Sequence, residues 1–224
     1  MTQEFPAMRS SLRTPRAAAI AGILFSLTLS ASLALIWGSI PDDPLHASAD
    51  EIVDLRKIAF ALDLLPFAGI AFLWFVGVLR DRMGEREDRF FSTLLLGSGL
   101  LFLAMLFVAG ALAGGLLGAI GAGMSPLLQS GAYALGRVQI YRTVHIYALR
   151  MAGVFLMSTA TIVLRIRIAP PWMGYLGYVV ALALVFMSSG AMQWVALAFP
   201  LWVLLVSSYI LFDNLRRGTD AKEG

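Results

Sequence analysis

Two charged side chains lie inside long apolar stretches of this sequence, where an ionised group has the greatest chemical consequence. Asp63 interrupts the run KIAFALDLLPFAGIAFLWFVGVLR between Lys57 and Arg80, and Arg150 lies in a later apolar run. In hydrocarbon, a charged side chain costs at least about 2.5 to 3.5 kcal/mol, so such residues usually face a bundle interior and have a partner. The pattern therefore predicts either a structural ion pair between Asp63 and Arg150 or a proton or cation site at Asp63.

Pro66, less than one helical turn after Asp63, bears on this choice. A proline inside a helix has no amide hydrogen, so the carbonyl of Leu62 loses its usual donor and a kink is expected. A carboxylate, a free carbonyl and a bent helix can together bind a proton or cation, as broken helices do in transporters. A structural ion pair beside a kink fits the same residues, so the sequence leaves both hypotheses open.

Signatures of catalysis and of metal binding are few. Ser98 lies between glycines in LGSGL, but the spacing is not that of a nucleophile elbow. His145, in YRTVHIYALR, is predicted to join Tyr141 and Arg142 in a polar cluster near the outer membrane surface. The chain has two histidines and no cysteine, so we predict no catalytic residue, no metal site and no cofactor, which argues against an enzyme.

Small residues recur every four positions after the third apolar run. Gly110, Gly114 and Gly118 form such a stripe within GALAGGLLGAIGAG. On a helix, the stripe is a flat surface that lets a neighbouring backbone approach closely. We predict that these glycines pack against a helix, whether inside the bundle, in a homo-oligomer or in a re-entrant segment. The pattern does not decide whether residues 114–142 form a loop, a surface helix or a re-entrant segment.

The composition indicates which elements must position these residues. Hydrophobic residues make up 59% of the chain and charged residues 14%, compared with about 45 to 50% and about 25% in soluble domains. A helix needs about 20 apolar residues to cross a bilayer, so 224 residues allow about six crossings. We predict an all-α integral membrane bundle with spans at about 17–38, 58–79, 91–113, 143–164, 173–192 and 194–212. The transmembrane domain would cover 17–212, between an N-terminal segment at 1–16 and a C-terminal tail at 213–224.

The basic residues predict the orientation of these spans. With a cytoplasmic N-terminus, twelve Lys and Arg residues lie inside and four lie outside, the latter being Arg56, Lys57, Arg137 and Arg142. Short cytoplasmic loops carry such an excess of positive charge, so both termini and the terminal segments are predicted to be cytoplasmic. The same distribution accounts for the basic character of the chain, so the lipid bilayer, and not a nucleic acid, is the expected partner.

Two stretches resemble a known group of proteins. PRAAAIAGILFSL at 15–27 and LPFAGIAFLWFVGVLRDRMGEREDRFFSTLLLGSGLLF at 65–102 are similar to segments of uncharacterised bacterial multi-pass membrane proteins. The resemblance covers about the first half of the chain and consists of helix and loop patterns. It implies a location in the bacterial inner membrane and no particular activity.

Two functions of different classes follow from these residues. The first is a non-enzymatic membrane subunit or scaffold, held by the Asp63–Arg150 pair and assembled through the glycine stripe, as a homo-oligomer or with a partner membrane subunit. The second is a small transporter or proton- or cation-coupled carrier that uses Asp63. No inverted repeat relates residues 17–113 to 143–212, which favours the first function.

Overall fold

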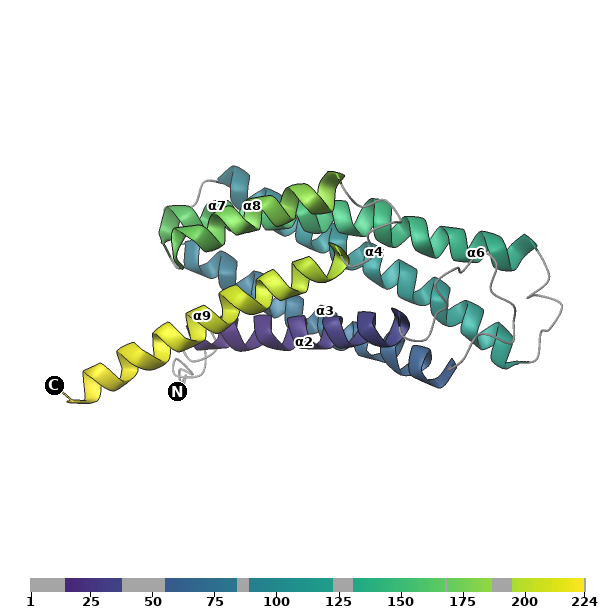
Figure 1. Cartoon of the computed structure of the whole chain (residues 1–224), viewed down its shortest axis with the longest axis horizontal. Coiled ribbons are helices and arrows are strands. Elements are labelled where there is room, and N and C mark those ends of the chain that lie inside the picture. The colour runs from purple at the N-terminus through teal and green to yellow at the C-terminus, as the bar shows by residue number, and fades with distance from the viewer. Residues whose placement is uncertain are drawn as a thin grey trace, which may run out of the picture.

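The computed structural model of the chain describes residues 15–37, 55–83, 89–122, 131–167, 169–186 and 195–223. These residues form six helical rods and, in the ranges just given, no strand (Figure 1). The rods are α2 (Pro15–Trp37), α3 (Leu55–Met83), α4 (Arg89–Gly121), the continuous series α6 (Gly131–Arg142), η3 (Thr143–Ala148) and α7 (Leu149–Ile166), then α8 (Pro171–Phe186) and α9 (Val195–Glu223). The predicted all-α bundle is confirmed.

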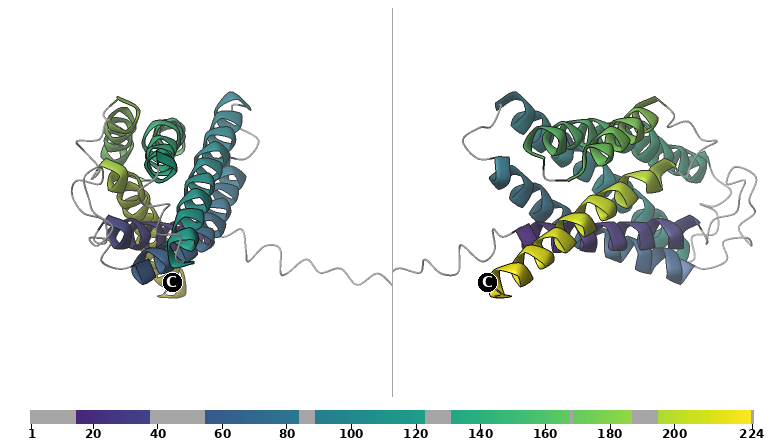
Figure 2. Two further views of the ribbon diagram at one scale, coloured as in Figure 1. Left: turned by 90° about the vertical axis from the view of Figure 1, so that its right-hand side faces the viewer. Right: turned by 60° about the vertical axis from the view of Figure 1, so that its left-hand side comes forward.

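Successive rods run in opposite directions along one bundle. The start of α2 and the end of α9 lie at the same end, whereas α4 ends and α6 begins at the other end (Figure 1). Figure 2 shows the same rods viewed along the bundle on the left and obliquely on the right. Five of them are long and apolar enough to cross a bilayer, and the sixth, α8, is shorter, with 16 residues. This is the architecture of a multi-pass membrane protein.

Several predicted span boundaries differ from the ends of the helices, and four of them differ most. The third span was predicted to end at residue 113 and the fourth to begin at 143, but α4 continues to Gly121 and α6 begins at Gly131. α9 continues past residue 212 to Glu223. The fifth span was predicted to reach residue 192, whereas α8 ends at Phe186 and residues 187–192 lie outside the described part of the chain, as does most of the N-terminal segment 1–16.

α4 and α6 together form a helical hairpin that extends past the neighbouring rods (Figure 1). α4 has 33 residues and is therefore about 50 Å long, whereas the hydrocarbon layer is about 30 Å thick. Glycines lower the intrinsic preference for helix, but packing compensates here, because the side chain of Leu116 lies against Gly136 of α6. The segment that the sequence left undecided is therefore helical in its described parts, 114–121 and 131–142.

The core contains one phenylalanine from each of five helices. Phe72 of α3 lies at its centre, with ring centroids 4.7 Å from Phe25, 5.0 Å from Phe155, 5.4 Å from Phe102 and 6.2 Å from Phe199. All five side chains are buried. Tilted and edge-on aromatic pairs at these distances add to the packing energy, so this cluster joins α2, α3, α4, α7 and α9.

Polar side chains inside the bundle are small. The buried polar residues of the described ranges are all serine or threonine. Most of these hydroxyls donate a hydrogen bond to the carbonyl four residues earlier in their own helix, as Ser26 does to Gly22 (2.7 Å) and Thr159 to Phe155 (2.9 Å). Between helices, the Trp202 indole of α9 donates to the Met173 carbonyl of α8 (3.0 Å). The described interior thus contains no buried ionisable side chain.

Candidate functional site

Asp63 lies on the outer surface of the bundle. Its side chain is exposed on α3, within a stripe of large exposed side chains formed by Phe60, Phe67, Ile70 and Trp74. The spacing of three and four residues places all five on one helix face. In a bilayer this face meets lipid or another protein, so the carboxylate is directed away from the core.

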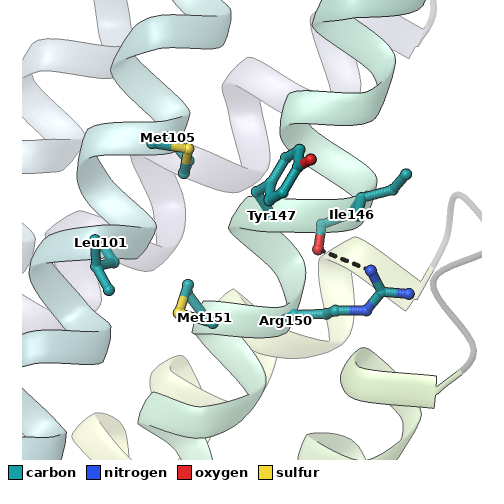
Figure 3. A pocket seen from close by; sticks show the side chains of 6 residues that line it. All are labelled: Leu101, Met105, Ile146, Tyr147, Arg150 and Met151. Carbon is teal, nitrogen blue, oxygen red and sulfur yellow. Dashed lines mark hydrogen bonds between the residues drawn. The ribbon is translucent and has the colours of Figure 1, made fainter.

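Arg150 also lies on the outer surface, in the first turn of α7. Its Nε donates to the Val185 carbonyl of α8 (3.4 Å). Its Nη1 donates to the Ile146 carbonyl (3.3 Å), the bond drawn in Figure 3. Val185 is in the last turn of α8, where carbonyls have no partner within the helix. A cation at this position also interacts favourably with the negative end of the helix dipole. Within this chain, Arg150 therefore caps the end of α8.

The structure does not bring Asp63 and Arg150 together within one chain. Among the described residues, neither side chain forms an ion pair with the other, and α4 packs against both α3 and α7. α3 and α7 meet in the core, through Phe72 and Phe155. Any contact between the two charged side chains thus stays a prediction, and the exposure of both leaves them accessible to another molecule.

Pro66 shares the exposed character of Asp63. α3 continues from Leu55 to Met83 without a break, and the proline ring is exposed at the bundle surface. The predicted kink at Pro66 stays a prediction. The proline and the carboxylate thus occur together on the outward part of α3 and not along an interior route.

A shallow pocket of about 410 Å³ lies between α4 and the η3–α7 segment. Its walls are mostly apolar and consist of Leu101, Met105, Ile146, Tyr147, Arg150 and Met151. In Figure 3 the side chains of Met105 and Met151 flank the gap between the two helices, whereas the Arg150 guanidinium points away from it. Among its lining side chains, Tyr147 contributes a phenol, and none is a carboxylate, histidine or other general base. The pocket therefore lacks the acid–base pair that hydrolysis or group transfer requires.

The remaining polar side chains form local contacts. The His145 ring stacks on Tyr141 (centroids 4.1 Å apart), and its Nδ1 lies 3.1 Å from the Tyr141 carbonyl oxygen. The Ser98 hydroxyl donates to the Leu94 carbonyl of its own helix (2.6 Å). In the ranges that the structure covers, no group of three His, Cys, Asp or Glu side chains could hold a metal ion. These contacts are structural and contain no activated nucleophile.

The predicted glycine stripe is only partly covered within the chain. A Cβ added at Gly110 would meet Leu65 of α3 at 3.0 Å, so this glycine packs inside the bundle. At Gly114 and Gly118 an added Cβ would have no described heavy atom within 4 Å. The packing role predicted for these two glycines stays a prediction. A helix that packs against them would have to come from outside the described residues of this chain.

Close contacts between helix backbones occur at two glycines that the sequence reasoning did not single out. A Cβ at Gly153 of α7 would lie 2.7 Å from Val185 Cγ2 and 3.0 Å from the Ala181 carbonyl oxygen. At Gly177 of α8 it would lie 2.9 Å from Ala160. The sequence contains a signal for one of these contacts, because Gly177 and Ala181 are four residues apart, as in other small-residue packing motifs.

Comparison with protein-family models, curated proteins and solved structures finds no match to this chain. The resemblance to bacterial multi-pass membrane proteins therefore stays a prediction. The functional argument depends on the bundle and on the positions of its charged side chains.

Proposed function

We propose that this protein is a non-enzymatic subunit or scaffold of the bacterial inner membrane that assembles with other membrane-embedded chains. The observation that carries the proposal is the outward position of both intramembrane charges, Asp63 on α3 and Arg150 on α7. The free energy of placing a charged side chain against lipid is unfavourable by at least about 2.5 to 3.5 kcal/mol. A second protein surface with a complementary group would remove much of this cost, so assembly stabilises the charged residues.

The composition of the interior also supports assembly over transport. A proton- or cation-coupled carrier places ionisable side chains along a route through the bundle. In the described ranges, the interior holds the five-phenylalanine cluster and buried Ser and Thr hydroxyls, and Asp63 lies outside it. The carrier that uses Asp63 thus stays the alternative, with less support from the arrangement of the side chains.

The mass of the purified protein and its ion permeability test these two functions. We expect particles that contain at least two chains of 24.2 kDa, or one such chain with a different membrane protein, after purification in a mild detergent. Proteoliposomes loaded with a pH-sensitive dye should show no proton or cation flux above that of empty liposomes. Monomeric particles, together with a flux that Asp63→Asn abolishes, would establish the carrier instead.

The distribution of basic residues supports the orientation in which both termini are cytoplasmic. Six rods with alternating direction place the start of α2 and the end of α9 at one end (Figure 1). Twelve Lys and Arg residues belong to that end by sequence, compared with four at the opposite end. The end at which α4 and α6 extend past the bundle is then the outer side.

Reporter fusions check this orientation. A reporter attached after Leu55 or Gln129 is expected to be active on the outer side, and one attached after Glu87, Ala169 or the C-terminus on the cytoplasmic side, because of the positive charge retained there. Paired reporters, one active only outside and the other only inside, control for expression. An outer C-terminus would contradict the orientation, and an outer C-terminus together with a cytoplasmic N-terminus would also contradict the even number of spans.

A further inference from the structure

The two outward charges lie on surfaces of similar construction. On α3, Asp63 lies in the exposed stripe of Phe60, Phe67, Ile70 and Trp74. On α7, Arg150 shares an exposed face with Tyr147 and Met157, next to Leu101 of α4. From Phe60 to Trp74 the α3 face thus contains one charged side chain, Asp63, and the α7 face contains one of opposite sign, Arg150. The exposed Arg56 and Lys57 lie about one turn further out on α3. The opposite charges of Asp63 and Arg150 provide the complementarity that two interacting surfaces require.

The two charges also lie at similar depths in the membrane. Phe72 and Phe155 define a common level for α3 and α7, because their ring centroids are 5.0 Å apart. Asp63 precedes Phe72 by nine residues, about 13.5 Å, and Arg150 precedes Phe155 by five, about 7.5 Å. The Arg150 side chain extends back to the Ile146 carbonyl, which reduces this difference. The carboxylate and the guanidinium are therefore within about one helical turn of the same depth.

Arg150 retains donors for another group. A guanidinium has five N–H donors, and the described contacts use two of them, at 3.3 and 3.4 Å. These distances are longer than those of most N–H···O bonds, about 2.7 to 3.2 Å, so the contacts with Ile146 and Val185 are weak. A carboxylate forms shorter and stronger bonds with the planar guanidinium, often two in parallel.

We propose that Arg150 of one copy binds Asp63 of a second copy of this chain. The inference rests on the proposed function as a membrane-embedded assembly and names the partner in it. The intermolecular pair brings together the α3 face around Asp63 and the α7 face around Arg150. It leaves the Arg150 contact with the end of α8 in place, so that the guanidinium connects two elements of its own chain to the neighbouring one.

The position of the two faces limits the symmetry of the assembly. They belong to different helices that both pack against α4, so two copies can pair reciprocally about a twofold axis, or each copy can use a different surface in a heterologous contact. Repeated heterologous contacts form either a ring or an open filament. Copies that cross the same bilayer share one orientation and one depth. No copy can therefore be displaced along the membrane normal relative to its neighbour, as an open helical filament around that normal would require, and a closed ring is favoured.

Cross-linking of engineered cysteines tests the contact, since the native chain has no cysteine. Two copies with different tags, one with Phe60→Cys and the other with Tyr147→Cys, are expressed together and treated in membranes with a short bismaleimide. Both residues are exposed and each precedes its charged residue by three positions, so the Asp63–Arg150 pair itself stays intact. We expect a product of twice the chain mass that carries both tags. The matched control replaces Phe60→Cys by Ile70→Cys, an exposed residue of the same stripe about 15 Å deeper, and should give about tenfold less product.

The double variant with Phe60→Cys and Tyr147→Cys in one chain, which retains Asp63 and Arg150, distinguishes the intermolecular pair from an intramolecular one. A ladder of multiples of the chain mass is expected, ending at the number of copies in the closed assembly. A product of single-chain mass would show that the pair forms within one chain and would overturn the proposal. Absence of any product would also overturn it.

A charge-removing variant provides a second readout. Asp63→Asn retains the side-chain volume at an exposed site and should leave thermal unfolding of the single chain unchanged, while it weakens self-association by about tenfold or more. If the oligomer persists unchanged and the product between positions 60 and 147 is absent, another surface holds the assembly, and the scaffold function stands while this contact does not. Unchanged association together with retention of anionic phospholipid that Arg150→Leu abolishes would assign Arg150 to a lipid phosphate instead.

Discussion

Phe72→Ala is expected to lower the free energy of unfolding by about 3 kcal/mol. Phe72 is fully buried and its ring contacts phenylalanines from four other helices, so its removal leaves a cavity at the centre of the bundle. The expected loss lies at the low end of the roughly 3 to 5 kcal/mol found for buried Phe→Ala changes. It is at the low end because membrane helices associate from lipid and not from water, which reduces the transfer contribution.

The matched control for this change is Phe67→Ala, in the same helix and of the same residue type. The Phe67 side chain is 67% exposed on the outer face of α3, so its truncation leaves no cavity in the single chain. Equilibrium unfolding of both variants in mixed detergent micelles, followed by the tertiary fluorescence signal, measures the difference. Equal losses for Phe72→Ala and Phe67→Ala would contradict the central position of the aromatic cluster.

Gly153→Leu is expected to destabilise the protein by about 2 to 3 kcal/mol, the upper part of the usual range for overpacking. Even the first added carbon would lie 3.0 Å from the Ala181 carbonyl oxygen and 2.7 Å from a Val185 methyl group. The backbone of α8 cannot rotate away as a flexible side chain does, so α7 and α8 must separate. Their separation would also weaken the hydrogen bond between Thr161 and Tyr178 (2.7 Å).

Gly114→Leu serves as the control for Gly153→Leu. It makes the same chemical change within a helix, at a site where nothing in the described chain lies within 4 Å. The stability of the single chain should stay the same or rise slightly, since leucine favours helix more than glycine does. Thermal unfolding in detergent and the oligomer mass are measured for both variants. A reduced oligomer mass for Gly114→Leu would place the glycine stripe between chains, and equal destabilisation by both variants would contradict the predicted role of Gly153.

The sequence alone determined the class of the protein and the approximate position of most helices. Long apolar runs separated by short charged segments admit only helices that cross a bilayer, because every backbone group must form its hydrogen bond within the membrane. It also identified Asp63 and Arg150 as the unusual residues. A charged side chain within a membrane-spanning helix has a free-energy cost that follows from the apolar sequence around it, so the tertiary structure is not needed to recognise it. The ends of α4 and α6 were not determined, because glycine lowers the preference for helix and the sequence does not show the packing that offsets it, such as Leu116 against Gly136.

Only the tertiary structure decided which face of each helix is inside. A helix of a soluble protein marks its buried face by apolar residues, whereas a membrane helix is apolar on all sides and carries no such mark. Phe72 and Phe67 are therefore equivalent by sequence, although one is central to the core and the other is exposed. Gly153 and Gly114 differ in the same way. Arg150 caps the end of α8 because the fold brings that helix end to it, and neither spacing nor depth in the sequence contains this contact.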